Sequence, residues 1–213
     1  MLAFALLTTL VFADDKVIKI DADVIAAMKK KVAGKITVDK KSGTLQLAYD
    51  FRIPKQGNDF LIKEKPANVK GGLVVKPNTS VQHVVPWKAV QVEAEVQIIK
   101  MLGPVMKSAE SKAVLSLGGL NVDTLYLEYP NQPTRFQIIV PERERTGLRT
   151  IRFDLTEDSS LVSFESSQVK EPTKLGDAGR IEFFGGHYGH GFRAIVFRGK
   201  PDPEWLKELV EKN

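Results

Sequence analysis

Apolar and polar residues alternate with a period of two along most of the chain between residues 35 and 199. Around Ile36–Val38 and Leu45–Tyr49 the alternation is clear, and the turn signal Lys41-Ser42-Gly43 between them predicts a β-hairpin. Further strands are predicted at Val81–Val85, Val90–Ile99, Ala113–Leu117, Thr124–Tyr129, Arg135–Val140, Leu148–Leu155, Leu161–Ser166, Arg180–Phe184 and Phe192–Arg198. Many short alternating strands with turn signals between them indicate an all-β protein, a sandwich or jelly roll.

The joints between these strands are rich in Gly, Pro and charged residues. They are expected at Pro86-Trp87-Lys88, Gly118-Gly119, Pro130–Pro133, Glu142–Gly147, Glu157–Ser160 and Lys170–Gly179. Residues 52–80 are rich in Pro, Gly, Lys and Asn and predict an irregular stretch with a short strand at Gly72–Val75. No internal repeat is evident.

Two short helices are expected to bracket the strands. Residues 21–33 have the helical period, with Asp21 or Asp23 as the N-terminal cap and Gly34 where a C-terminal cap belongs. At the other end Asp202 caps a helix in which Trp205, Leu206 and Leu209 form an apolar stripe. The predicted organisation is a helical segment at 14–34, a β-sandwich at 35–199 and a C-terminal helix at 200–213.

The first residues, Met1 to Ala13, are apolar and carry no charge. They are too short to span a bilayer, which takes about 20 apolar residues. The stretch is typical of a signal peptide, with Val11-Phe12-Ala13 as the cleavage site before Asp14, although no Lys or Arg precedes it. A buried N-terminal strand is the alternative. We expect an exported protein, periplasmic or extracellular, with no transmembrane segment after cleavage.

Composition limits the possible functions. The 213 residues contain no cysteine, which excludes thiolate metal sites and cysteine nucleophiles. With 31 basic and 26 acidic residues the net charge is +5. The sequence contains no arginine-rich cluster with interleaved aromatic residues, so nucleic acid is not expected as a partner. Fingerprints for nucleotide binding, serine hydrolysis and zinc proteolysis are absent.

Several blocks together resemble a known family. They are Leu45–Phe51 (LQLAYDF), Asp59-Phe60, Gly71–Val75, Val90–Ile98 (VQVEAEVQI), Gly179–Gly186 (GRIEFFGG) and Phe192–Gly199 (FRAIVFRG). The order resembles the concanavalin A-like lectin/glucanase domain, a jelly roll, in the form common in exported proteins of environmental bacteria and related to 3-keto-disaccharide hydrolase-like domains. The resemblance implies a jelly-roll β-sandwich over about residues 35–199 and a carbohydrate ligand.

One strand carries a candidate catalytic pattern. Glu93, Glu95 and Gln97 point to one face of their strand. Glucanases that this chain resembles carry a Glu-x-Asp-x-Glu strand whose outer carboxylates are the nucleophile and the acid/base. Retaining hydrolysis needs two carboxyl groups about 5–5.5 Å apart. Gln97 cannot deliver a proton, so a polar outer face without catalysis is the competing interpretation.

A glycine-rich loop provides a second candidate site. His187, Tyr188 and His190, with Arg193 just beyond, could contact a glycan or a partner. The two histidines could also hold a metal if Glu182 or His83 supplied a third ligand. The alternative is a tight connection whose polar residues face water.

Two further groups of residues are candidate ligand contacts. His83 with Trp87 could form a sugar-stacking platform, or Trp87 could seal the edge of the core. Asp50, Asn58 and Asp59 offer oxygen ligands for calcium, but their spacing matches no calcium loop. No cofactor is otherwise expected.

The leading hypothesis is an exported, non-catalytic β-sandwich that binds carbohydrate or another envelope ligand. The first alternative is a glycoside or keto-disaccharide hydrolase that uses Glu93 and Glu95. The second is a structural or assembly protein whose C-terminal helix docks a partner. The oligomeric state stays open.

Overall fold

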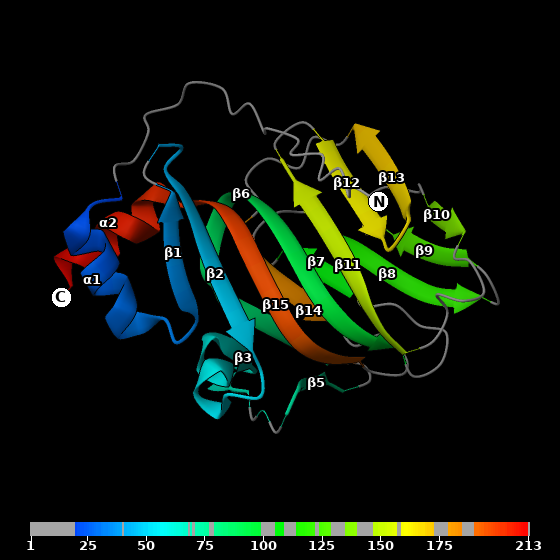
Figure 1. The fold of residues 1–213 in the computed structure, drawn as a ribbon, viewed down its shortest axis with the longest axis horizontal. Coiled ribbons are helices and arrows are strands. Elements are labelled where there is room, and N and C mark those ends of the chain that lie inside the picture. The colour runs from blue at the N-terminus through cyan, green and yellow to red at the C-terminus, as the bar shows by residue number, and fades with distance from the viewer. Residues whose placement is uncertain are drawn as a thin grey trace, which may run out of the picture.

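The chain folds into two layers of antiparallel strands with two helices at one end, as the computed structural model in Figure 1 shows. The structure describes residues 20–39, 41–67, 69, 71–76, 79–98, 105–108, 114–121, 124–128, 135–139, 147–156, 159–172, 179–184 and 190–212. The expected signal peptide at residues 1–13 and the loop residues His187 and Tyr188 lie outside this part of the chain.

The front layer carries the face on which the candidate site lies. Its strands, in order across the sheet, are β1 (Lys35–Asp39), β2 (Thr44–Asp50), β15 (His190–Pro201), the second half of β6 (Ser80–Ile98), β11 (Gly147–Leu155), β12 (Ser159–Phe164) and β13 (Ser167–Pro172). In Figure 1 these strands run in front of β14 and β7.

The back layer is built on the first half of β6. Its strands, in order, are β3 (Phe60–Ile62), β6, β14 (Gly179–Phe184), β7 (Val105–Ser108), β8 (Val114–Asn121), β9 (Thr124–Glu128) and β10 (Arg135–Ile139). The short strands β4 (Lys65–Pro66) and β5 (Leu73–Val75) pair with β3 and β15, and the 3₁₀ helix η1 spans Pro54–Asp59.

Strand β6 belongs to both layers, and this corrects an expectation. Pro86-Trp87-Lys88 was predicted as a turn, but β6 runs through it as one strand of 19 residues. Up to Trp87 the strand pairs with β14, from Trp87 onward it pairs with β15, and from Val90 onward it pairs with β11 as well. Proline has no N–H to donate to a ladder, so Pro86 marks the place where the strand changes layers.

A second predicted joint between strands, which is rich in glycine, is also wrong. Gly118-Gly119 was expected to end a strand, but β8 continues through it, and its register with β9 shifts between Gly118 and Leu120. Glycine inside a strand is typical of a bulge as well as of a turn. Strands β7 and β13 lie where no strand was predicted.

The core lies between the two layers and is strongly aromatic. Fully buried rings come from β2, β3, β6, β14 and β15: Tyr49, Phe60, Trp87, Phe183, Phe192 and Phe197. Burying one such side chain contributes roughly 1.5–3 kcal/mol. Along β2, the second half of β6 and β15 beyond Ala194, buried residues alternate with partly exposed ones, as the sequence pattern predicts, so the intervening side chains point away from the core.

The two helices form where they were predicted. Helix α1 (Ala22–Lys31) is capped by the Asp21 carboxylate, which accepts hydrogen bonds from two backbone N–H groups at 3.0 and 3.1 Å. Helix α2 (Pro203–Glu211) is capped in the same way by Asp202. Leu206 and Leu209 of α2 are buried in the chain's own core, and the two helices are in contact. This packing favours an intramolecular role for α2 over the docking of a partner.

Gly34 does not act as a helix cap. Helix α1 ends at Lys31, and its C-terminal cap is Val32, an extended residue whose N–H donates to the Met28 carbonyl. Gly34 instead faces the ring of Tyr49, and a methyl group on its Cα would lie 2.6 Å from the ring carbons. The position therefore needs glycine for close packing and not for a left-handed turn.

Candidate functional site

Three rows of side chains cross the front layer on the side away from the core. We call this surface the outward face. From β2 to β15, β6 and β11, the first row is Gln46, Arg198, Gln91 and Asp154, the second is Ala48, Val196, Glu93 and Arg152, and the third is Asp50, Ala194, Glu95 and Thr150. The residues that alternate with these along each strand are buried. This holds over the ranges 45–49, 92–96, 151–155 and 195–199.

Glu93 lies between two arginines from neighbouring strands. Its Oε2 is 3.9 Å from Arg152 Nη2 and 3.7 Å from Arg198 Nη1. Gln91, two residues earlier on β6, accepts hydrogen bonds at its Oε1 from the same two guanidinium groups, at 3.2 and 3.3 Å. Arg198 also donates from Nε to Gln46 Oε1 at 2.8 Å. These bonds hold a row of donors and acceptors in place across four strands.

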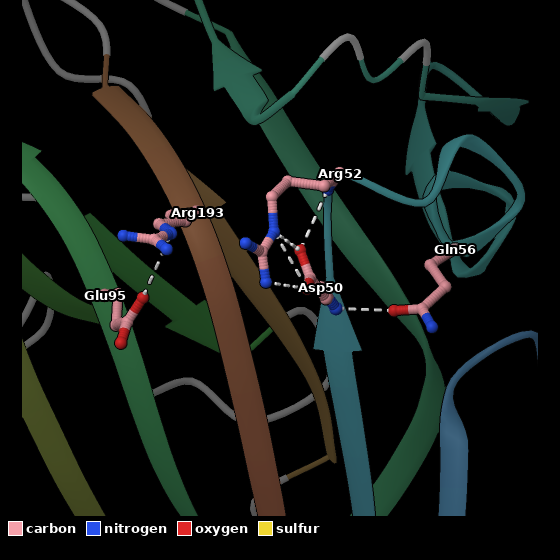
Figure 2. Close-up of polar contacts among 5 residues, drawn as sticks. All are labelled: Asp50, Arg52, Gln56, Glu95 and Arg193. Atoms are coloured by element: carbon pink, nitrogen blue, oxygen red, sulfur yellow. Dashed lines mark hydrogen bonds and ion pairs between the residues drawn. The ribbon is translucent and has the colours of Figure 1, made fainter.

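Glu95 lies beside Arg193, so the structure brings together two residues that belonged to separate sequence candidates. The Arg193 Nε to Glu95 Oε2 distance is 3.8 Å, and both side chains are about half exposed, at 49% and 45%. Figure 2 shows this pair next to a second one, in which Arg52 donates from Nε and Nη2 to the Asp50 carboxylate. Hydrogen bonds from Arg52 lower the pKa of Asp50 to about 2, so Asp50 is ionised at neutral pH.

Asp154 is the most deeply placed carboxyl group of the three rows. Its Oδ1 is buried and has no hydrogen-bond partner among the described residues. Burial raises the pKa of Asp154, while Gln91 and Arg152 act in the opposite direction. Asp154 lies opposite Gln91 and therefore diagonal to Glu93, which places two carboxyl groups on adjacent strands of one face. Asp154 is not recognisable as a site residue from the sequence, because nothing in its local sequence pairs it with residue 93.

His83 and Trp87 do not form an exposed platform. Both are 0% exposed. Their rings lie parallel to Phe197, with centroids 4.1 Å (His83) and 5.9 Å (Trp87) from it. In this conformation neither can stack on a sugar, so their prediction as ligand contacts is wrong and the alternative of a core seal fits.

A buried polar network joins α1 to both layers. Asp59 Oδ2 accepts hydrogen bonds from the N–H groups of Ala33 (2.8 Å) and Gly34 (3.1 Å) and from the Tyr49 hydroxyl (2.9 Å). The same hydroxyl is 2.8 Å from His83 Nε2. With its single proton directed at Asp59, Tyr49 accepts from His83, which therefore carries its proton on Nε2.

This network explains part of the sequence motif. The tyrosine of Tyr-Asp-Phe and the aspartate of Asp-Phe bond each other, and the two phenylalanines, Phe51 and Phe60, pack edge to face. The Asp59 carboxylate thus already accepts hydrogen bonds from N–H and O–H donors, and the Asp50 carboxylate already accepts them from Arg52. The calcium hypothesis for Asp50, Asn58 and Asp59 gains no support from this geometry.

The loop before β15 is described only at its end. His190 opens β15 opposite Val75, and Arg193 is exposed on the outward face. Within the described ranges, no group of three or more His, Asp or Glu side chains is arranged to hold a metal. Nor does any helix of the described residues have the length and apolar character needed to cross a membrane.

Comparison with known proteins identifies the fold. No family model matches the sequence, and no curated protein is significantly similar to it. Among solved structures, the chain is similar to the Crh5 transglycosylase in complex with NAG, with a TM-score of 0.54 and 11% identity over 74% of this chain and 85% of that chain. It is also similar to a native glycosidic hydrolase (TM-score 0.55, 9% identity, 71% and 94% covered).

A third similar structure is SCLam, a non-specific endo-β-1,3(4)-glucanase from family GH16, with a TM-score of 0.53 and 10% identity over 79% of this chain and 97% of that chain. The chain therefore has the concanavalin A-like jelly-roll fold, as its sequence motifs implied. At these identities the similarity defines the fold and leaves the function to the residues of the site.

Proposed function

We propose that the mature protein is an exported, non-catalytic β-sandwich that binds carbohydrate on the outward face of its front layer. The observation that carries the proposal is the chain of hydrogen bonds from Gln46 through Arg198 and Gln91 to Arg152, which holds amide and guanidinium groups of four strands in place. Such preorganised donors and acceptors suit sugar hydroxyl groups, because little side-chain entropy is lost on binding.

Proteins with similar structures also support a carbohydrate ligand. One similar structure is a transglycosylase solved with NAG, and another is a β-1,3(4)-glucanase. Gln97 stands where glucanases that this chain resembles carry their acid/base, which favours binding over hydrolysis. The proposal of export rests on the signal sequence. Mass spectrometry of the protein recovered outside the cytoplasm tests it, and we expect a chain that begins at Asp14.

The mode of binding differs from what the sequence suggested. Stacking on aromatic rings was expected, but the three rows of the outward face contain no aromatic side chain. We therefore expect recognition to rest on hydrogen bonds.

Replacing Arg198 by Ala is expected to weaken glycan binding at least about tenfold. The change removes donors to Gln46 and Gln91 and an ion pair to Glu93, and a hydrogen bond to a charged group contributes roughly 1.5–3 kcal/mol. The measurement is a glycan array followed by calorimetry on the best ligand. Lys207→Ala, on the exposed side of α2, is the control and should bind like the parent. Absence of binding to any carbohydrate would refute the proposal.

Hydrolysis is the second candidate, and Asp154 is the observation that favours it. A carboxyl group with a raised pKa, diagonal to the ion-paired Glu93, could act as the acid that Gln97 cannot be. The protonated Asp154 would donate to the glycosidic oxygen as the C–O bond breaks. Glu93 would assist attack of water at the anomeric carbon, and the proton that water releases would restore the acid.

Under the leading proposal we expect no turnover of glycosides or keto-disaccharides by the parent protein. If turnover is found, Glu93→Gln, Glu95→Gln and Asp154→Asn should be assayed beside Asp39→Asn, which changes an exposed carboxylate on the edge strand β1. Loss of at least about a hundredfold in kcat for Glu93→Gln and Asp154→Asn alone would establish that pair. Activity that survives all these changes would place catalysis elsewhere.

A further inference from the structure

The outward face has a floor of small side chains between two charged clusters. Ala48 of β2 and Ala194 and Val196 of β15 are adjacent in the register and partly exposed. At one end of this floor lies Arg198, bonded to its glutamine neighbours, and at the other end lie the Arg193–Glu95 and Arg52–Asp50 pairs of Figure 2. Along β15, Arg198 and Ala194 are four residues apart, or about 13 Å, which accommodates a pyranose ring.

A β-bulge shapes one end of the floor. Phe192 pairs with Val96 and Ala194 pairs with Glu95, so Arg193 is an extra residue on β15. The bulge interrupts the alternation: Arg193 and Ala194 are both accessible, while Phe192 and Ile195 are buried. Bulges of this kind re-aim a side chain next to a functional site. Here the bulge adds a guanidinium group to a face on which strict alternation would have left none at this position.

Arg193 differs from the other arginines of this face in its hydrogen bonding. Arg52, Arg152 and Arg198 each donate hydrogen bonds to a neighbouring side chain. Among the described residues, Arg193 forms an ion pair with Glu95 at 3.8 Å, which is longer than a hydrogen bond, and its charge also acts on Asp50; its side chain is 49% exposed. Within the described part of the chain, its remaining N–H donors are therefore available to a ligand.

The four guanidinium groups on this surface lie among four carboxyl groups, those of Asp50, Glu93, Glu95 and Asp154. The four guanidinium groups of Arg52, Arg152, Arg193 and Arg198 are each within 4 Å of a carboxylate of Asp50, Glu93 or Glu95. Because each guanidinium group is already paired with a carboxylate, the surface offers little net attraction to an anionic polymer. Alternating donors and acceptors instead match neighbouring sugar hydroxyls, each of which both donates and accepts.

We propose that the Ala48–Ala194–Val196 floor is a subsite for one ring of a neutral sugar, with Arg193 donating to one hydroxyl and Glu95 accepting from its neighbour. The inference rests on the proposed function and names its ligand class and a specificity residue. The small side chains leave room for the ring, and the bulge supplies the donor.

The test uses the full mature protein and matched oligosaccharides on one array: oligomers of glucose, galactose and mannose beside oligomers of the corresponding uronates. We expect binding to a neutral member and little change in affinity, less than about twofold, between low and high salt. On the best neutral ligand, Ala194→Leu should lower the affinity at least about tenfold by filling the floor, and Arg193→Ala about fivefold. Ala26→Leu, an equal change at an exposed position of α1, is the control.

Circular dichroism and thermal unfolding of each variant show whether the fold is kept, and Ala48→Leu serves as a second blocking variant if Ala194→Leu does not fold. Preference for uronates, or an affinity that falls steeply with salt, would overturn the neutral-sugar assignment and leave the proposed function standing. Unchanged affinity in folded Ala194→Leu or Ala48→Leu would overturn the subsite. Failure to bind any carbohydrate would remove the proposed function as well.

Discussion

Replacing Asp59 by Ala is expected to lower the free energy of unfolding by about 3–5 kcal/mol, the cost typical of breaking a buried charged group's hydrogen bonds. The carboxylate is 1% exposed and is the acceptor for the Ala33 and Gly34 N–H groups and for the Tyr49 hydroxyl. Without it, three donors stay buried with one acceptor fewer each. The segment after α1 would lose its anchor to β2, so the helix end should loosen first.

Urea unfolding followed by circular dichroism measures this effect, and hydrogen exchange at Ala33 and Gly34 locates it. Asp50→Ala is the matched control, since this aspartate is nine residues away in sequence and bonds the exposed Arg52. It should change the stability by less than about 1 kcal/mol. Equal losses in the two variants would show that the buried network does not stabilise the fold.

Acidification should destabilise the protein through His83. Burial lowers the pKa of His83 to about 3, against an ordinary value of 6.5. The unfolded chain therefore takes up a proton near pH 6.5, while the folded chain does so only near pH 3. Stability from this group is complete above about pH 6.5 and is lost as the pH falls toward 3, by up to about 1.4 kcal/mol per pH unit. Between pH 7.5 and 5 the loss should reach about 2 kcal/mol.

The measurement is the free energy of unfolding in urea at several pH values from 7.5 to 5, for the parent and for His83→Gln. The variant starts from a lower stability, but its slope with pH should be smaller by the amount that His83 contributes. Tyr49, which bonds His83, and Asp59, which bonds Tyr49, are present in both proteins. Burial raises the pKa of Asp59, which opposes acid destabilisation equally in the two proteins. A variant that keeps the full slope would contradict this role of His83.

The strands and helices could be predicted from the sequence wherever the signal is local. Alternation at Leu45–Tyr49 and at Val92–Val96 is a property of consecutive residues, and it correctly separated the buried from the outward side chains. The caps Asp21 and Asp202 are likewise local, because a capping side chain bonds N–H groups two or three residues away. The same reasoning placed Glu93 and Glu95 on one accessible face.

The connections between strands were less predictable, because Gly and Pro occur both in turns and at irregular places inside strands. Pro86-Trp87-Lys88 lies inside β6 and Gly118-Gly119 lies inside β8. Whether the chain reverses at such a place depends on the strands that pair on each side. Those partners, β14 and β15 for β6, come from the far end of the sequence.

The class of fold, the two helices and the side of each strand that faces the core follow from the amino-acid sequence alone, since period and capping are local. Which outward residues meet depends on the pairing of distant strands: Arg198 contacts Gln46 and Gln91, which are 152 and 107 residues away in sequence. Only the tertiary structure decides that His83 is buried and that a bulge turns Arg193 toward Glu95. Both outcomes depend on register between distant strands, which no local pattern encodes.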